Sequence, residues 1–160
     1  GASISANCKT REDSIIDLEN GKFILYIKAS YPGYTPCLLT AELDGKTSSM
    51  EIILDGETNV DKYTSTAWKP EYNDMRRNPN LHNGRHFLFR GTIQDITMTG
   101  YKNVFIVDIS NNSDAEQLIH VEYWGNDFDF NQGDRIRIFG NRWGNVENIP
   151  RILAKYVYDR

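Results

Sequence analysis

The sequence predicts a mainly β protein: a five-stranded barrel in its second half, preceded by an N-terminal antiparallel β-meander and one short helix. Aromatic residues make up 12% of the 160 residues and recur in alternating runs, a composition that favours strands. Turn residues such as Gly, Pro, Asn and Asp separate short apolar runs at close spacing. No long helical pattern interrupts the runs of the second half, as expected for a small closed barrel.

The meander is predicted over residues 22–54, because three apolar runs are separated there by strong turn signals. The polar residues 1–14 are predicted to lack regular structure, and the polar residues 56–69 are predicted to be a connector. The organisation expected is therefore an N-terminal β-rich part, 1–69, and a barrel with its lead-in helix, 70–160. The predicted strands of the meander are Lys22–Lys28, Cys37–Leu43 and Ser49–Leu54.

The one predicted helix covers Pro70–Arg77. Proline suits the first turn of a helix, and the carboxylates of Glu71 and Asp74 favour its N-terminal end. Asn78-Pro79 then stops it, because the residue before a proline is biased away from helical geometry.

Five strands are predicted between Arg85 and Tyr158. Gly91 inside the first strand indicates a bulge or a sharp bend. Gly140 is predicted to end the fourth strand and Arg142-Trp143-Gly144 to form a turn, so that the fifth strand begins after Pro150. The predicted strands are His86–Ile96, Asn103–Ser110, Gln117–Trp124, Arg135–Phe139 and Arg151–Tyr158.

Alternation within these strands separates an interior from an exterior face, since successive side chains of a strand point to opposite sides. The exterior set mixes polar and aromatic residues. The predicted interior side chains are Phe87, Phe89, Ile93, Ile119, Val121, Tyr123, Ile136 and Ile138.

Several segments carry a family resemblance. Phe87–Ile96 resembles the opening strand of many OB-fold domains, and Gly133–Gly140 followed by Ile149–Ala154 resembles their closing part. Tyr72–Pro79 is similar to a short helix ending in Arg-Asn-Pro that precedes an OB barrel in uncharacterised exported proteins and lipoproteins of Gram-positive bacteria. The resemblance covers residues 70–158, and it implies an OB-type Greek-key barrel, export and attachment to the cell envelope.

The expected ligand site follows from the fold, because OB barrels bind along the outer face of their second and third strands and in two neighbouring loops. Aromatic rings near a cation suit stacking against a base or a sugar. The alternative is that Trp124 and Trp143 simply pack against the N-terminal half. The predicted ligand-binding residues are Tyr101, Lys102, His120, Trp124, Arg142 and Trp143.

The charge balance disfavours nucleic acid. The chain has 18 Lys and Arg against 22 Asp and Glu, a net charge of −4, whereas proteins that grip a phosphate backbone usually have a cationic surplus. Arg135 and Arg137 would line a groove, but acidic residues lie in the same region, and such a mixture is typical of a solvated face. These acidic residues are Asp108, Glu122, Asp127, Asp129 and Asp134.

No catalytic, cofactor or metal motif is found. The chain has no Gly-x-Ser-x-Gly around a serine, no phosphate-binding glycine loop and no His-Glu-x-x-His. Asp127-Phe-Asp129 lacks the repeated oxygen ligands and terminal Glu of a calcium loop. We therefore expect neither enzymatic activity nor a bound cofactor or metal.

The two cysteines, Cys8 and Cys37, do not have the spacing of zinc ligands. Two alternatives stand: two free buried thiols, or a disulfide, which is favoured if the protein is exported. Ser5-Ala6-Asn7 before Cys8 fits a lipid-attachment signal poorly.

The function expected is that of a non-enzymatic, exported binding module of the bacterial cell envelope, with a protein or a glycan as partner. The alternative is an OB-fold protein that binds single-stranded nucleic acid. No apolar run is long enough to predict a membrane span.

Overall fold

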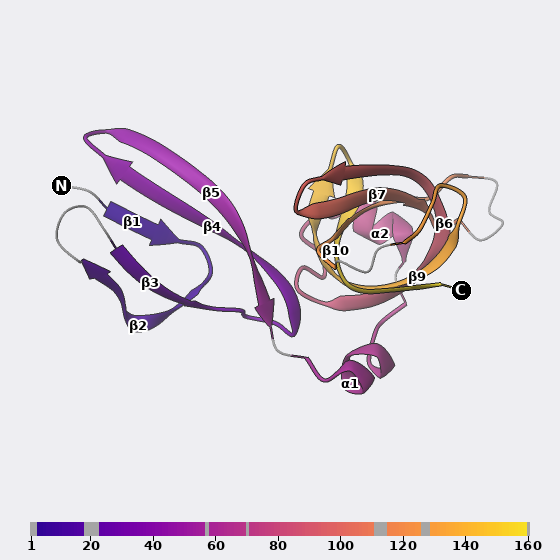
Figure 1. Ribbon diagram of the computed structural model, residues 1–160, viewed down its shortest axis with the longest axis horizontal. Coiled ribbons are helices and arrows are strands. Elements are labelled where there is room, and N and C mark those ends of the chain that lie inside the picture. The colour runs from indigo at the N-terminus through magenta and orange to yellow at the C-terminus, as the bar shows by residue number, and fades with distance from the viewer. Residues whose placement is uncertain are drawn as a thin grey trace. The chain divides into compact units, whose positions relative to one another are not determined.

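The chain folds into two compact units, Gly1–Glu57 and Thr58–Arg160, so the division falls earlier than the expected boundary after residue 69. The computed structural model in Figure 1 describes residues 3–17, 23–56, 58–69, 71–110, 115–125 and 129–159.

The N-terminal unit contains two antiparallel sheets (Figure 1). The larger one has the order β1-β4-β5, and the smaller one pairs β2 with β3. The turn between β4 and β5 consists of Asp44 at φ 50° and Gly45 at φ 75°, the backbone pattern of a tight hairpin. The strands are β1 (Ser3–Ala6), β2 (Lys9–Asp17), β3 (Phe23–Lys28), β4 (Gly33–Leu43) and β5 (Lys46–Gly56).

A three-stranded antiparallel sheet was expected here and is present, but one of its members differs. β1 takes the place beside β4 that the sequence assigned to residues 22–28, and β3 pairs with β2 instead. The expectation that residues 1–14 lack regular structure is therefore wrong for residues 3–6 and 9–14. Both strands are polar and lack a strong apolar alternation, so the side-chain pattern gave no signal for them.

A disulfide between Cys8 and Cys37 joins the N-terminal segment to β4. The two Cα atoms are 5.3 Å apart, and Cys37 is fully buried. Next to the bridge, the Asn7 and Leu38 segments exchange two hydrogen bonds: the Asn7 N–H donates to the Leu38 carbonyl (3.2 Å), and the Leu38 N–H donates to Asn7 Oδ1 (2.8 Å). Of the two alternatives for the cysteines, the structure contains the bridged one.

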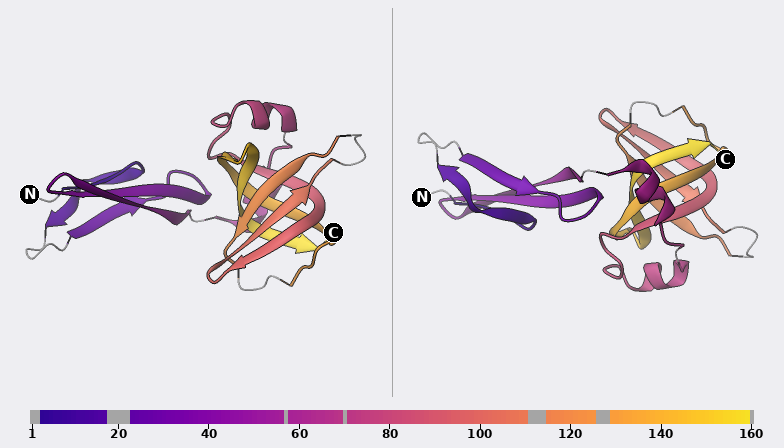
Figure 2. Two further views of the ribbon diagram at one scale, coloured as in Figure 1. Left: turned by 90° about the horizontal axis from the view of Figure 1, so that it is seen from above. Right: turned by 90° about the horizontal axis from the view of Figure 1, so that it is seen from below.

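The second unit is a closed barrel of five strands in the order β10-β8-β7-β6-β9 (Figure 2). All neighbours are antiparallel except β8 and β10, whose parallel pairing closes the ring. This is the Greek-key connectivity of an OB barrel, as the sequence predicts. The strands are β6 (His86–Thr99), β7 (Lys102–Asp108), β8 (Leu118–Tyr123), β9 (Arg135–Val146) and β10 (Ile149–Asp159).

The barrel interior is filled by the side chains that strand alternation places there. All eight predicted interior residues are at most 6% exposed and belong to one apolar cluster. Gly91 is required for closure, because a Cβ at this position would lie 2.3 Å from the Asp108 carbonyl oxygen of β7. The extra residue that shifts the register is Gln94, between Ile93 and Asp95, so the bulge lies beyond Gly91.

The fourth strand is longer than predicted. β9 runs through Gly140 to Val146, so Gly140 does not end it and Arg142-Trp143-Gly144 is not a turn. Gly140 marks a close approach instead, since a Cβ there would lie 2.7 Å from the Leu153 carbonyl oxygen. The turn is formed by Glu147 and Asn148, both with positive φ.

Two short helices precede the barrel, whereas one was predicted. α2 (Tyr72–Arg77) is the expected helix, and its Met75 is 1% exposed within the apolar cluster of the barrel, so α2 covers one end of the ring (Figure 1). α1 (Val60–Ser65) lies in the segment predicted to be a connector. It is only six residues long, too short for a helical periodicity, and its visible signal is Asn59, whose side chain caps the Lys62 N–H.

Reduction of the disulfide should destabilise the N-terminal unit alone. The bridge closes a loop with a sequence separation of 29, for which loop entropy contributes about 3–4 kcal/mol. The three tryptophans lie at positions 68, 124 and 143, all in the barrel unit, so their fluorescence reports on the barrel. We expect reductant to lower the protection of β4 and β5 amides from hydrogen exchange and to leave the Trp-monitored unfolding transition in place. A shift of the Trp transition by several degrees would contradict this.

Candidate ligand-binding faces of the barrel

A carboxylate and two cations form the centre of the outer face of β7, β8 and β10. Glu122 on β8 accepts hydrogen bonds from Lys102 Nζ (2.7 Å) and from Arg151 Nε (2.7 Å) and Nη2 (3.2 Å). The Glu122 side chain is 4% exposed, whereas the side chains of Lys102 and Arg151 are 21% and 15% exposed. We call Lys102, Glu122 and Arg151 the triad. The buried carboxylate holds both cations in place and leaves the triad with one net positive charge.

Opposing effects set the pKa of the Glu122 carboxyl. Burial acts to raise it, but hydrogen bonds from Arg151 and Lys102, together with their positive charges, hold the pKa below its ordinary value. His120, two residues away on β8, has its pKa lowered mainly by burial, so its imidazole is neutral at pH 7. Its Nδ1 is buried without a hydrogen-bond partner among the described residues.

Exposed apolar and aromatic side chains flank the triad. Met98 and Tyr101, in the hairpin between β6 and β7, are 77% and 76% exposed. Lys102 Nζ lies 5.8 Å from the centre of the Trp124 ring, a cation–π distance. The structure thus brings together four of the predicted residues, Tyr101, Lys102, His120 and Trp124, on one side of the barrel.

The other two predicted residues lie elsewhere than expected. Arg142 is in β9 and fully buried, so its predicted place in a loop is wrong. Its guanidinium donates to the Met75 carbonyl of α2 (3.1 Å), to Asn145 Oδ1 and to the Arg151 carbonyl (3.5 Å), and burial lowers its pKa to about 10. Trp143 is also a β9 residue and is half-buried.

A second group of side chains covers the outer face of β6, β9 and β10. Arg90 of β6 is paired in register with Arg137 of β9, which is paired in turn with Tyr158 of β10. Arg135 lies two residues before Arg137 and therefore on the same face. Arg90 and Arg135 are exposed, and no ion pair to any of the three arginines is found within the described ranges. We call Arg90, Arg135, Arg137 and the tyrosines beside them the arginine face.

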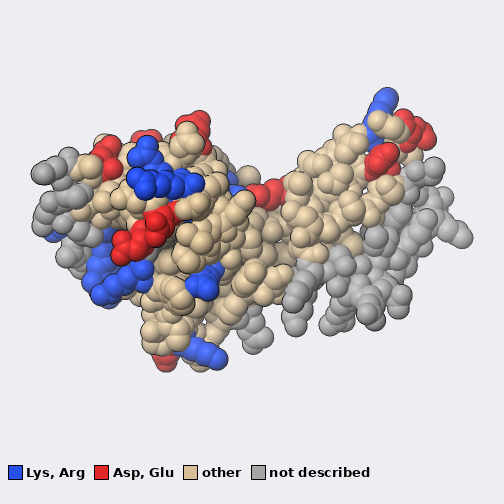
Figure 3. All heavy atoms as spheres, turned by 180° about the vertical axis from the view of Figure 1, so that it is seen from behind, with Lys and Arg blue, Asp and Glu red and all other residues tan. Residues whose placement is uncertain are grey.

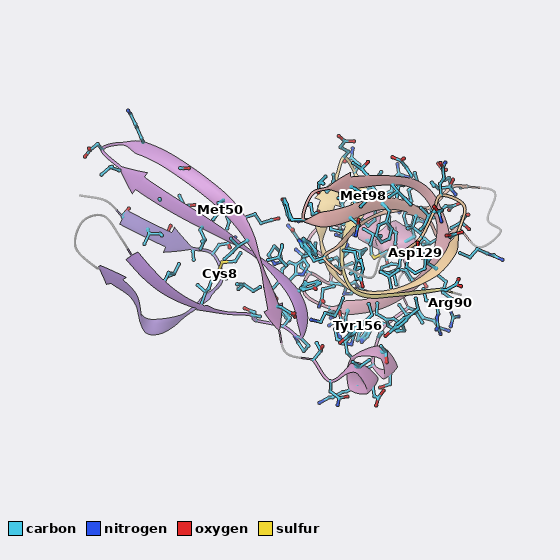
Figure 4. The ribbon with its side chains drawn as sticks, in the orientation of Figure 1. Cys8, Met50, Arg90, Met98, Asp129 and Tyr156 are labelled. Atoms are coloured by element: carbon cyan, nitrogen blue, oxygen red, sulfur yellow. A yellow bond between two sulfur atoms is a disulfide. The ribbon has the colours of Figure 1, made fainter. Side chains whose placement is uncertain are left out.

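Aromatic rings interleave with these cations. The Arg137 guanidinium carbon lies 5.7 Å from the centre of the Tyr158 ring, and the Tyr156 and Tyr158 rings stack with centroids 6.3 Å apart. Phe139 meets Tyr158 edge-on at 6.1 Å. Figure 4 shows Arg90 and Tyr156 on the same side of the barrel and Met98 on another side. The arginine face is therefore separate from the triad.

Most residues of these two faces were not among the predicted ligand-binding residues. Arg151 was missed because the parallel pairing that places it beside His120 joins strands distant in sequence. Arg135 and Arg137 were considered but set aside because acidic residues are close in sequence. In the structure, Asp134 accepts a hydrogen bond from the Asn131 N–H within its own turn, while Asp159 at the end of β10 is exposed.

The overall charge of the barrel unit is balanced. Residues 58–160 contain 13 Lys and Arg and 13 Asp and Glu, so the net charge of −4 comes from residues 1–57, which contain 5 and 9. Figure 3 shows basic and acidic side chains close together on one side of the molecule, with no field of a single sign. Any site for a polyanion on this unit is therefore confined to a small part of its surface.

Two further properties bear on function. In the described part of the chain, no three His, Cys, Asp or Glu side chains gather in a way that would hold a metal ion. Within those residues, no helix is long and apolar enough to cross a membrane.

The strand order and the parallel closure define the class of the second unit, a five-stranded barrel of OB type with a lead-in helix. No protein-family model and no curated protein matches the chain. Among solved structures, it is similar to the Ifi202 HINa domain in complex with 20-base-pair dsDNA, with a TM-score of 0.42 and 11% identity over 100% of this chain and 98% of that one.

Two other solved structures are similar to this chain. A chain of a replication protein A heterotrimer bound to ssDNA has a TM-score of 0.38 and 13% identity, and one of the Stn1–Ten1 complex of S. pombe has 0.37 and 17%. Each alignment covers 47% of this chain and 57% of the other, so this chain matches little more than half the length of these two proteins. At such identities the similarity concerns the fold alone.

Replacing Glu122 by Gln should destabilise the barrel by roughly 2–4 kcal/mol, because two partly buried cations lose their counter-charge. The wild-type carboxyl has a lowered pKa in the folded state, so its stabilisation is present above its ordinary pKa near 4.5 and is lost as the pH falls through the lower folded-state value.

Urea unfolding monitored by Trp fluorescence at several pH values checks this prediction. The E122Q protein should lose the part of the acid dependence that begins below about pH 4.5. The part that begins below pH 6.5, to which His120 contributes through its lowered pKa, should remain. Equal stability of E122Q and wild type at pH 7 would show that the triad does not stabilise the barrel.

Proposed function

We propose that the barrel unit is a non-enzymatic binding module and that its ligand is a single-stranded nucleic acid held on the arginine face. The observation that carries the proposal is the row Arg90–Arg137–Tyr158, in which arginines from two strands, without an ion pair to any described residue, lie next to an accessible ring. A guanidinium donates two parallel hydrogen bonds to a phosphate, and a tyrosine ring offers a surface on which a base can stack.

The arrangement suits a flexible strand better than a rigid duplex. Two arginines on β9 are separated by one residue, about 7 Å along the strand, and the third lies on the neighbouring strand. Such short spacings match successive charges of one extended chain. Tyr158 is 37% exposed and is held in place by Tyr156 and Phe139, so a base would stack on it at little entropic cost. The similar solved structures include proteins bound to ssDNA and to dsDNA, which is in line with the proposal but does not carry it.

The salt dependence of binding tests the proposal. Titration with a labelled oligothymidylate of roughly 15 nucleotides, the upper part of the range for one OB barrel, should give a log–log salt slope near −2 if all three arginines contact phosphates. Each single change, R90Q, R135Q or R137Q, should reduce the slope by about 0.7 and weaken binding about fivefold at 0.1 M salt.

Arg77→Gln is the matched control, because Arg77 is an exposed arginine at the end of α2, away from the arginine face. It should change neither the slope nor the affinity. The proposal fails if the oligonucleotide does not bind at low salt, or if R77Q weakens binding as much as the three variants of the arginine face.

A second candidate function is supported by the triad and its surroundings. The Glu122 carboxylate satisfies the two cations there, while Met98 and Tyr101 project from the hairpin, and such side chains are enriched where proteins contact one another. The disulfide in the N-terminal unit favours an oxidising compartment. From the exposed hairpin and the disulfide we infer an alternative function. In it the protein is exported and binds a protein or glycan of the cell envelope beside the triad.

The hairpin provides the test that separates these functions. In a sedimentation assay with purified cell-wall glycan, a M98A/Y101A variant should lose binding if the hairpin holds the partner, while its affinity for the oligonucleotide stays unchanged. Retained sedimentation of this variant would reject a glycan at this hairpin. The compartment can be determined on protein purified from its native source. Attached glycans would indicate export, whereas two free thiols would indicate a reducing compartment.

A further inference from the structure

A pocket of about 370 Å³ lies in the barrel unit at the start of β6, next to the arginine face. Trp68 pairs with β6 through two hydrogen bonds: its N–H donates to the His86 carbonyl (3.2 Å), and its carbonyl accepts from the Leu88 N–H (2.9 Å). The next residue, Lys69, lines the pocket. The ends of β7 and β8 form the opposite wall. The lining residues are Lys69, Tyr72, Leu88, Phe89, Arg90, Ile109, Ser110 and Gln117.

The lining has the mixed chemistry of a nucleotide site. Leu88, Ile109 and the half-buried Tyr72 offer apolar surface, and Tyr72 is fixed by its packing against the barrel core. Exposed Lys69 and Arg90 supply two cations at the rim. Small-molecule pockets measure about 300–1,000 Å³, so this one is of a size for a single nucleotide and not for a longer segment.

Two polar groups inside the pocket suit the edge of a base. The Gln117 side-chain amide offers both a donor and an acceptor. The Ser110 hydroxyl donates to Asp108 Oδ2 (3.0 Å), which leaves its oxygen available as an acceptor. Asp108 also accepts from the Ser110 and Gln117 backbone N–H groups, so this end of β7 is held in position before any ligand arrives.

We propose that this pocket binds one unstacked nucleotide, with its base against Tyr72, Leu88 and Gln117 and its phosphate between Lys69 and Arg90. The inference rests in part on the proposed function, because Arg90 belongs to both the pocket and the arginine face. It adds to that function a position at which the strand is read by its base, whereas the arginine face contacts phosphates without regard to sequence.

Binding of 5′-mononucleotides tests the pocket without a longer strand. In NMR titrations of the full chain with dAMP, dCMP, dGMP and dTMP, we expect shifts of the Ser110 and Gln117 amides and an affinity that differs at least severalfold among the four bases. Q117A and K69Q should each weaken binding by tenfold or more. The matched control is R77Q, which changes an exposed arginine that belongs neither to the pocket nor to the arginine face and should leave mononucleotide binding unchanged.

Two further ligands distinguish the contribution of the phosphate to binding from that of the base. Inorganic phosphate alone should bind at least tenfold more weakly than a mononucleotide, and equal affinity would overturn the assignment of a base site. The thymidine nucleoside should also bind more weakly, because it lacks the group that Lys69 and Arg90 would hold. If Q117A unfolds, Gln117→Glu, which keeps the size and changes the donor to an acceptor, should alter the preference among bases instead.

The outcomes separate this inference from the proposed function. If the oligonucleotide binds with the expected salt slope but no mononucleotide binds, the pocket is rejected and the arginine face stands. If mononucleotides bind through Gln117 and Lys69 but the oligonucleotide does not bind, the pocket stands and the proposed function fails. Shifts that are confined to residues outside the pocket would reject it as well.

Discussion

The buried guanidinium of Arg142 holds the second unit together. The last turn of a helix leaves backbone carbonyls without partners, and in α2 Arg142 satisfies one of them, that of Met75. The same guanidinium reaches the Arg151 carbonyl of β10, and its own backbone exchanges hydrogen bonds with residues 84 and 85. A single residue of β9 thus joins the lead-in helix, the segment just before β6 and the last strand. The burial of a cation that no carboxylate neutralises within the described residues costs free energy, which these hydrogen bonds offset.

Asn141 extends this organisation to α1. Its Oδ1 accepts from the Tyr63 hydroxyl (2.7 Å), and its Nδ2 donates to the Gly84 carbonyl (2.9 Å). Tyr63 stacks on His86 of β6 and meets Tyr156 of β10 edge-on, so α1 packs on the outside of the barrel beside the arginine face. Residues 58–85, which contain no barrel strand, thus cover part of the barrel through Tyr63 of α1 and Met75 of α2.

Local sequence pattern was sufficient for the barrel and insufficient for its surface. Alternation around Phe87, Ile119 and Ile136 identified the interior, because burial of one face of a strand leaves a period of two in the sequence. Arg151 could not be placed beside Glu122 in this way, since their contact depends on a parallel pairing between strands about thirty residues apart. Arg142 was misplaced because a glycine and an arginine–tryptophan pair look like a turn, while the close approach at Gly140 and the buried hydrogen bonds appear only in the folded chain.

The length of β6 has a consequence for how the barrel would engage its ligands. Its first half pairs with β9 and contributes Arg90, and its second half, which contains the bulge, pairs with β7 and leads to Met98. One continuous strand of 14 residues therefore contributes to a candidate binding surface in each of its halves. In mechanical terms it is a rigid spacer, and a barrel built on it is geometrically bivalent. Two ligands joined by a linker of suitable length would bind with an avidity above either single affinity, without any conformational coupling between the two surfaces.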